Sequence, residues 1–123
     1  MVRVLLNCST LVKGGALQAA VWFIRTAVNQ KDTDIRWHYI LSRSLADELE
    51  RFGMLPDLQL IAIVERSPAR CSESRRSIGS LAKSLNPDVV FTLFGPAYVD
   101  FDSPHLCGVA DGWVTHGGCW AWK

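Results

Sequence analysis

The sequence lacks long hydrophobic runs and has almost no excess charge of either sign. Its apolar stretches, such as Val89–Phe94, are far below the roughly 20 residues that a membrane-spanning helix needs. Thirteen Lys and Arg residues against twelve Asp and Glu residues give a formal net charge of +1, which is not the basic field of a nucleic-acid-binding protein. These features argue against a transmembrane segment and against a nucleic-acid partner.

Metal-binding and redox motifs are also absent from the sequence. The four cysteines are Cys8, Cys71, Cys107 and Cys119. They form no C-x-x-C pair and have no patterned histidine partners, so the sequence predicts neither a zinc site nor a redox site. Free thiols in a reducing compartment are the simpler interpretation, and we expect no metal.

The beginning of the chain resembles a lipoprotein signal only superficially. Met1–Leu6 precedes Asn7 and Cys8, but this apolar region is shorter than the roughly seven residues that a signal peptide requires. We therefore expect a mature N-terminus and a cytoplasmic location.

The hydrophobic pattern alternates between short β-prone runs and segments with helical spacing. It predicts strands at Val2–Leu6, Arg36–Leu41, Leu58–Val64, Asp88–Phe94 and Leu106–Ala110. It predicts helices at Ala16–Val28, Leu45–Phe52 and Ser72–Leu85. Strands that alternate with helices form a parallel sheet with right-handed crossovers, and strands that are apolar throughout are covered on both faces. The 123 residues thus predict one α/β domain, Rossmann-like and three-layered, with a mostly parallel sheet of about five strands.

The loop after the first predicted strand is the first candidate binding feature. In such a sheet, ligands bind outside the carboxyl ends of the strands, where the two halves of the sheet diverge. Here Asn7–Thr10 leads to Gly14 and Gly15 at the start of a helix, whose free N–H groups and positive dipole end attract an anion. The alternative is a plain strand-to-helix turn in which both glycines only supply unusual dihedral angles.

The sequence lacks the motifs of two common functions of Rossmann-like domains, dinucleotide binding and phosphoacceptance in a receiver domain. The first loop has no G-x-G-x-x-G spacing, and Ser42-Arg43 stands where a dinucleotide site needs an acidic residue to bind a ribose. NAD binding is therefore disfavoured. A phosphoacceptor receiver domain needs clustered acidic residues after the first strand, where this chain has Asn7-Cys8-Ser9.

Later strand ends supply candidate substrate-binding side chains. The Gly95-Pro96 turn would expose Tyr98, which suits stacking on a sugar, although Tyr98 capping the sheet edge is an equal alternative. Asp111 and Trp113 follow the fifth predicted strand and would lie beside Gly14 and Tyr98. Carbohydrate sites often combine a carboxylate with a large aromatic ring, but packing accounts equally well for Trp113.

Basic and imidazole side chains give weaker signals. Four arginines surround the start of the third predicted helix: Arg66, Arg70, Arg75 and Arg76. They are consistent with a phosphate site, but Glu65 and Glu73 offset them, and a solvated helix end is the simpler interpretation. His38 lies inside a strand and is better explained as a packed residue than as a base. His105 and His116 flank the fifth predicted strand and are better placed than His38 to act as a base.

Three stretches carry a family resemblance. They are Leu5–Asn7 leading to Lys13–Ala16, Asn86–Phe91, and Gly108–Trp113. In their order and spacing the chain resembles the N-terminal half of GT-B glycosyltransferases, particularly those of family 4. The likeness spans nearly the whole chain. It implies two Rossmann-like domains that face a cleft, of which the N-terminal one mainly holds a sugar-containing acceptor and the C-terminal one holds a nucleotide-sugar donor.

The resemblance also implies roles for individual residues. The Gly14-Gly15 loop would lie against the donor diphosphate and help to stabilise charge on the leaving group without a bound metal. From their positions after the strands, and not from the resemblance, we expect Tyr98 and Trp113 to contact substrate. On the same ground we expect Asp111 to act on the acceptor as a hydrogen-bond acceptor or general base. Many family members carry a histidine just after the fifth strand, whereas this chain has Asp111 there and His116 five residues later.

We therefore expect residues 1–123 to form the acceptor-side domain of a glycosyltransferase. The nucleotide sugar is a co-substrate, and we expect no further cofactor. The chain ends at Lys123, before the linker to a donor domain, so this part alone is expected to be inactive. Two alternatives remain. One is a stand-alone nucleotide-binding module in which Ser42-Arg43 holds a phosphate, and the other is a truncated reading frame without a function of its own.

Overall fold

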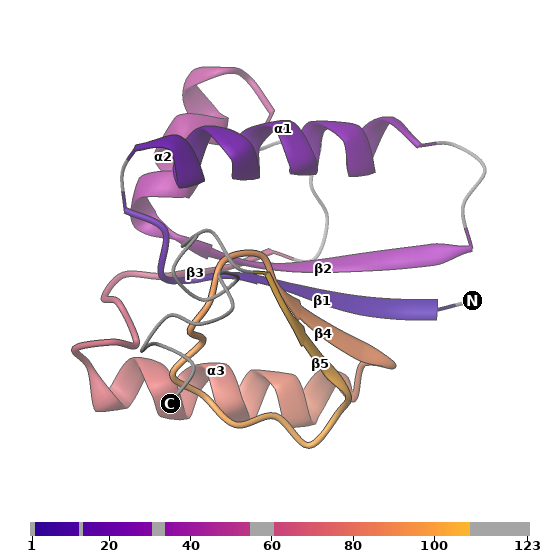
Figure 1. Ribbon diagram of the computed structural model, residues 1–123, viewed down its shortest axis with the longest axis vertical. Coiled ribbons are helices and arrows are strands. Elements are labelled where there is room, and N and C mark those ends of the chain that lie inside the picture. The colour runs from indigo at the N-terminus through magenta and orange to yellow at the C-terminus, as the bar shows by residue number, and fades with distance from the viewer. Residues whose placement is uncertain (1, 13, 31–33, 55–60, 109–123) are drawn as a thin grey trace, which may run out of the picture.

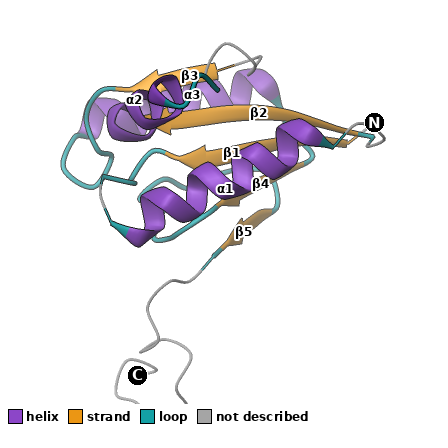
Figure 2. Cartoon of the chain, turned by 90° about the horizontal axis from the view of Figure 1, so that it is seen from above, coloured by secondary structure: helices purple, strands orange, loops and turns teal. Residues whose placement is uncertain are grey.

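The computed structural model describes residues 2–12, 14–30, 34–54 and 61–108. The strands are β1 (Val2–Cys8), β2 (Ile35–Ser42), β3 (Ile61–Val64), β4 (Val89–Thr92) and β5 (His105–Cys107). The helices are α1 (Gly15–Asn29), α2 (Arg43–Arg51) and α3 (Ser72–Leu85). All neighbouring strands pair in parallel, in the order β3-β2-β1-β4-β5 (Figure 2). The predicted Rossmann-like α/β fold is confirmed.

The helices cover both faces of the sheet. Figure 1 shows α1 and α2 on one face and α3 on the other. Successive side chains of β1 alternate between them: Leu6 and Cys8 pack into the cluster that contains α1 and α2, and Leu5 joins Ile78 of α3 in the second cluster. This two-sided burial is the reason that Val4–Leu6 of β1 and Val89–Phe91 of β4 are uninterrupted apolar runs.

Local sequence explains where the helices begin and end. The buried positions of α1, Leu17, Ala20, Val21 and Ile24, have the spacing of one helical face. The Ser42 hydroxyl accepts a hydrogen bond from the Leu45 N–H, 3.1 Å away, and so caps α2. The αL residue Asn86, with φ 45°, ends α3, and the Arg3 guanidinium donates to the carbonyl oxygens of Leu85 and Asn86.

Several strand boundaries differ from the prediction. β1 continues to Cys8 because Asn7 and Cys8 still pair with β2. β4 ends at Thr92, before Phe94, because its register with β1 ends at Asn7. β5 begins at His105, and residues 109–110 of its predicted range lie outside the described residues, as do residues 58–60 of the predicted third strand. Among the helices that the structure describes, none is both long and apolar enough to cross a membrane.

The order of strands places the switch point between β1 and β4. The crossover from β1 to β2 runs through α1 on one face, and the crossover from β3 to β4 runs through α3 on the opposite face (Figure 1). The connections that leave the carboxyl ends of β1 and β4 therefore diverge to opposite sides of the sheet. Ligands of this fold bind in the crevice formed at such a point.

Candidate functional site

The structure places two residues of the predicted site, Gly14 and Gly15, at the carboxyl edge of the sheet. Gly14 and Gly15 stand at the N-terminus of α1, directly after the loop that leaves β1. Tyr98 lies in the connection that leaves β4. Asp111 and Trp113 fall outside the described residues, so their predicted places beside Gly14 and Tyr98 remain predictions.

The two adjacent glycines differ in what the backbone requires of them. Gly14 has φ 80° and ψ −157°, a combination that is essentially restricted to glycine. Gly15 has no such φ, and a Cβ built there meets no heavy atom within 4 Å. The backbone therefore explains glycine at position 14, but neither conformation nor packing explains it at position 15.

The N-terminus of α1 is open. Gly14 is its N-cap and has no side chain to bond the first N–H groups, no side chain of the described residues caps it, and its first turn contains no acidic residue. The leading N–H groups of a helix have no partner within the helix, and they carry the positive end of its dipole. Gly14 and Gly15 are exposed and carry no side chain, as an anion site at a helix N-terminus requires.

Hydrogen bonds tie the beginning of the first loop, whose described residues are 9–12 and 14, to β1 and β4. The Asn7 side-chain oxygen accepts from the Ser9 N–H at 3.2 Å and from the Ser9 hydroxyl at 2.7 Å. The Asn7 amide nitrogen donates to Thr92 Oγ1 of β4 at 3.2 Å. Asn7, Ser9 and Thr92 are all buried, so the beginning of the first loop is tied to β4 inside the protein.

Ser42 fixes the same loop on its other side. Its hydroxyl donates to the Leu11 carbonyl oxygen at 2.5 Å while it accepts from the Leu45 N–H. Because a hydroxyl has one proton to donate, Ser42 has none left for a phosphate. Ser42 therefore serves the loop and the cap of α2.

Arg43 is paired with carboxylates. Its guanidinium Nε donates to Glu65 Oε2 at 3.0 Å and its Nη2 donates to Glu65 Oε1, and Asp47 lies 3.5 Å from Nη1. Hydrogen bonding to Arg43 lowers the pKa of Glu65, and the same contact raises the pKa of Arg43. These contacts count against a phosphate site at Ser42-Arg43, which was the basis of the binding-module alternative.

Tyr98 is held in an uncommon backbone conformation. Its φ is 62°, in the left-handed region that a bulky residue rarely adopts. On either side of it, Ala97 is buried and Val99 packs against the cluster around α3. The Tyr98 side chain is 49% exposed, so this loop presents an aromatic ring to solvent, as a residue that stacks on a sugar requires.

The described histidines have different surroundings. His38 is buried within β2, as expected of a packed residue, and its pKa is lowered by burial and by the nearby charges of Arg36 and Arg3. On β5, His105 Nε2 lies 2.6 Å from Thr92 Oγ1, and the ring meets Phe101 edge-on. Desolvation lowers the pKa of His105. His116 lies outside the described residues.

Among the described residues, two hollows with charged side chains in their linings lie away from the first loop. One, of about 280 Å³, is at the carboxyl end of β3 and is lined by Glu65, Arg66, Cys71 and Glu73, among others. Within the predicted arginine cluster, Arg75 donates to the Pro68 carbonyl oxygen at 2.7 Å and so supports its own loop. The acidic side chains Glu65 and Glu73 thus share this hollow with Arg66. This lining is consistent with a solvated helix end and does not favour a phosphate site.

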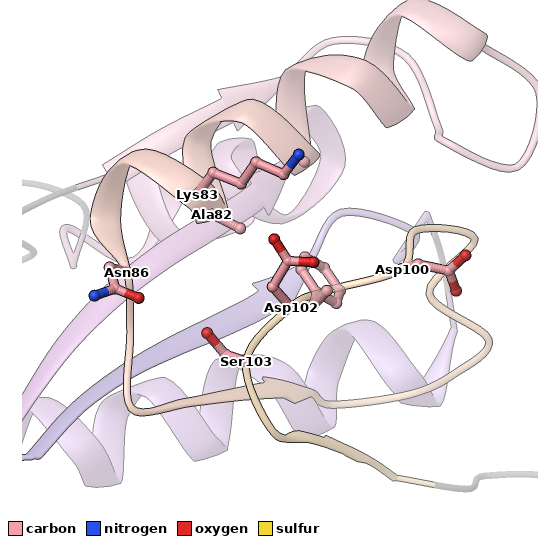
Figure 3. Close-up of a pocket in the computed structure, with 8 residues that line it drawn as sticks. Ala82, Lys83, Asn86, Asp100, Asp102 and Ser103 are labelled. Carbon is pink, nitrogen blue, oxygen red and sulfur yellow. The ribbon is translucent and has the colours of Figure 1, made fainter.

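The second hollow lies between the C-terminal half of α3 and residues 100–103 (Figure 3). It measures about 100 Å³ and is lined by Lys83, Asp102 and Ser103, among others. Because α3 ends where β4 begins, this hollow is at the amino end of the sheet, opposite the first loop. Ligand sites of this fold form at the other end.

Metal-binding and thiol chemistry find little support among the described residues. Within residues 2–12, 14–30, 34–54 and 61–108, no group of three or more His, Cys, Asp and Glu is placed to hold a metal ion. Cys8, Cys71 and Cys107 are free thiols, and burial raises the pKa of Cys8 to about 12. Cys8 is therefore an inert core residue at neutral pH.

Sequence reasoning missed the hydrogen-bonded group of Ser9, Asn7, Thr92 and His105. The available signal was a polar residue at the end of each of two apolar strands, Asn7 in β1 and Thr92 in β4. Their pairing depends on strand register, which the sequence did not specify.

Searches of protein-family models, curated proteins and solved structures find no match to this chain.

Proposed function

We propose that this chain is the acceptor-side domain of a glycosyltransferase that takes its sugar from a nucleotide-sugar donor. In this proposal the first loop and the N-terminus of α1 receive the donor diphosphate. The observation that carries it is Gly15, the first residue of α1, which has no positive φ and open space where a Cβ would lie, at a helix N-terminus without a side-chain cap. A side chain there would lie across the approach to the N–H groups.

The chemistry follows from where charge develops. Transfer of the sugar breaks its bond to the diphosphate, and negative charge accumulates on the departing phosphate oxygens. Backbone N–H donors and the positive end of a helix, fixed in advance of the reaction, stabilise this charge. The first loop is suited to this role because Asn7 and Ser42 hold it from two sides.

The acceptor would be held on the other side of the crevice. Tyr98 supplies an exposed aromatic ring, which suits the apolar face of a sugar. Asp111 and Trp113, after β5, are proposed to complete this side, with Asp111 as the hydrogen-bond acceptor or general base for the acceptor hydroxyl. A second Rossmann-like domain would hold the nucleoside of the donor, and transfer would need both domains.

A titration of the purified chain tests the proposed diphosphate site. Inorganic pyrophosphate, UDP-glucose and GDP-mannose share the diphosphate, and we expect each to bind with a dissociation constant on the order of 1 mM, because one domain supplies only part of the site. NADP and NAD serve as controls for the binding-module alternative. Equal, weak binding of NADP and NAD is expected because Ser42 and Arg43 are already bonded.

Isothermal titration or ligand-detected NMR gives these constants. Failure of pyrophosphate and both nucleotide sugars to bind would contradict the proposal. Preference for NADP over NAD would instead indicate a nucleotide-binding module that recognises the additional phosphate.

A further inference from the structure

A row of hydrogen-bonded side chains runs from the first loop across β1 and β4 to β5. Ser9 bonds to Asn7, Asn7 to Thr92 at 3.2 Å, and Thr92 to His105 at 2.6 Å. Asn7 and Thr92 are paired neighbours in the register of β1 with β4, and each is 1% exposed. The row therefore joins the loop of the proposed diphosphate site to the far edge of the sheet through the protein interior.

The directions of these hydrogen bonds follow from their donors. The Ser9 backbone N–H can only donate, so the Asn7 atom that faces it is the side-chain oxygen, and the Asn7 amide nitrogen faces Thr92. Thr92 Oγ1 accepts from that amide. The Thr92 hydroxyl can donate to His105 Nε2 when the neutral ring carries its proton on Nδ1, and it can accept from Nε2–H in the other tautomer.

We propose that Thr92 is a positioning residue for the diphosphate-binding loop, acting through Asn7, and this inference rests on the proposed function. Without the Thr92 hydroxyl, the Asn7 amide nitrogen would lose its acceptor inside the protein. A buried donor without a partner is costly, so Asn7 would turn to find another acceptor. That turn would release the Ser9 N–H and hydroxyl, which fix the direction in which the first loop leaves β1.

The test compares Thr92→Val with Thr92→Ser. Valine keeps the shape of threonine and removes its hydroxyl, whereas serine keeps the hydroxyl. The matched control is Thr26→Val on the exposed side of α1, where the hydroxyl donates to the Trp22 carbonyl oxygen at 3.0 Å. Ser9→Ala removes one of the two hydrogen bonds by which the loop contacts Asn7 and leaves β4 intact, so it serves if Thr92→Val does not fold.

Affinity for inorganic pyrophosphate is the functional readout. Thr92→Val is expected to weaken binding roughly tenfold, because a misdirected loop no longer aims its donors at the anion. Thr92→Ser and Thr26→Val should remain within about twofold of the wild-type chain. Ser9→Ala should weaken binding several-fold.

The ¹⁵N chemical shifts of the His105 ring supply a spectroscopic readout without ligand. They should report the same tautomer ratio in the wild-type chain and in Thr92→Ser, which keep the hydroxyl beside Nε2, and a changed ratio in Thr92→Val.

The outcomes separate this inference from the proposed function. Weaker binding by Thr92→Val with rescue by Thr92→Ser supports the positioning role. Wild-type affinity in folded Thr92→Val, or in folded Ser9→Ala where the first variant does not fold, would overturn it and leave a structural role only. Absence of pyrophosphate binding by the wild-type chain would contradict the proposed function itself, and the inference would fall with it.

Discussion

Gly108→Ala should lower the free energy of unfolding by roughly 3 kcal/mol, because overpacking against rigid backbone costs this much. A Cβ at Gly108 would lie 2.1 Å from the Leu93 carbonyl oxygen. The backbone has little freedom to move away, since the Gly108 N–H donates to the Thr92 carbonyl oxygen at 2.8 Å and its own oxygen accepts from the Gly95 N–H at 2.9 Å. The substitution should therefore detach β5 from β4.

Urea denaturation of the purified chain measures this effect. Gly79→Ala is the matched control, because its Cβ would meet only the Val99 side chain at 3.9 Å, an ordinary contact. Position 79 lies within α3, so alanine there should stabilise the chain by up to about 1 kcal/mol. A Gly108→Ala chain as stable as the wild type would contradict the close contact between position 108 and the Leu93 carbonyl oxygen.

Gly15→Val should weaken pyrophosphate binding at least tenfold, a threshold of about 1.4 kcal/mol in binding free energy. The branched side chain would stand over the open N-terminus of α1 and keep an anion from its N–H groups. The fold should tolerate it, because Gly15 has an ordinary φ and no heavy atom within 4 Å of the new Cβ. The free energy of unfolding should change by less than about 0.5 kcal/mol.

Ala19→Val is the control for Gly15→Val. It adds a branched side chain to an exposed position of α1, one turn further along the helix, and should leave pyrophosphate affinity unchanged. Equal affinities of Gly15→Val and the wild-type chain would reduce the two glycines to a strand-to-helix turn, which was the alternative that the sequence left open.

The fold was predictable because its determinants are local and periodic. Alternation of apolar runs with helically spaced segments specified the order of elements, and the nearly continuous apolar runs in β1 and β4 specified helices on both faces. Strand ends were less predictable. They depend on where a neighbouring strand stops pairing, as at Thr92, and this information is not local.

For the candidate site too, chain order predicted where residues lie, whereas long-range contacts were not predictable. The place of Gly14 and Gly15 followed from chain order, since a loop after the first strand must lie at the carboxyl edge of the sheet. The different requirements at the two positions did not follow, because they rest on a φ of 80° at one and open space at the other. The contacts of Asn7 with Thr92 and of Ser42 with Leu11 join residues far apart in the sequence and became visible only in the structure.

A pyrophosphate titration followed by amide chemical shifts of the ¹⁵N-labelled wild-type chain tests the central claim most directly. The account predicts that the largest shifts occur at the amides of Gly14, Gly15, Ala16 and Leu17, at the open N-terminus of α1. Largest shifts instead around Arg66 and Cys71, or around Lys83 and Ser103, would place the anion in one of the two hollows and contradict the assignment of the first loop.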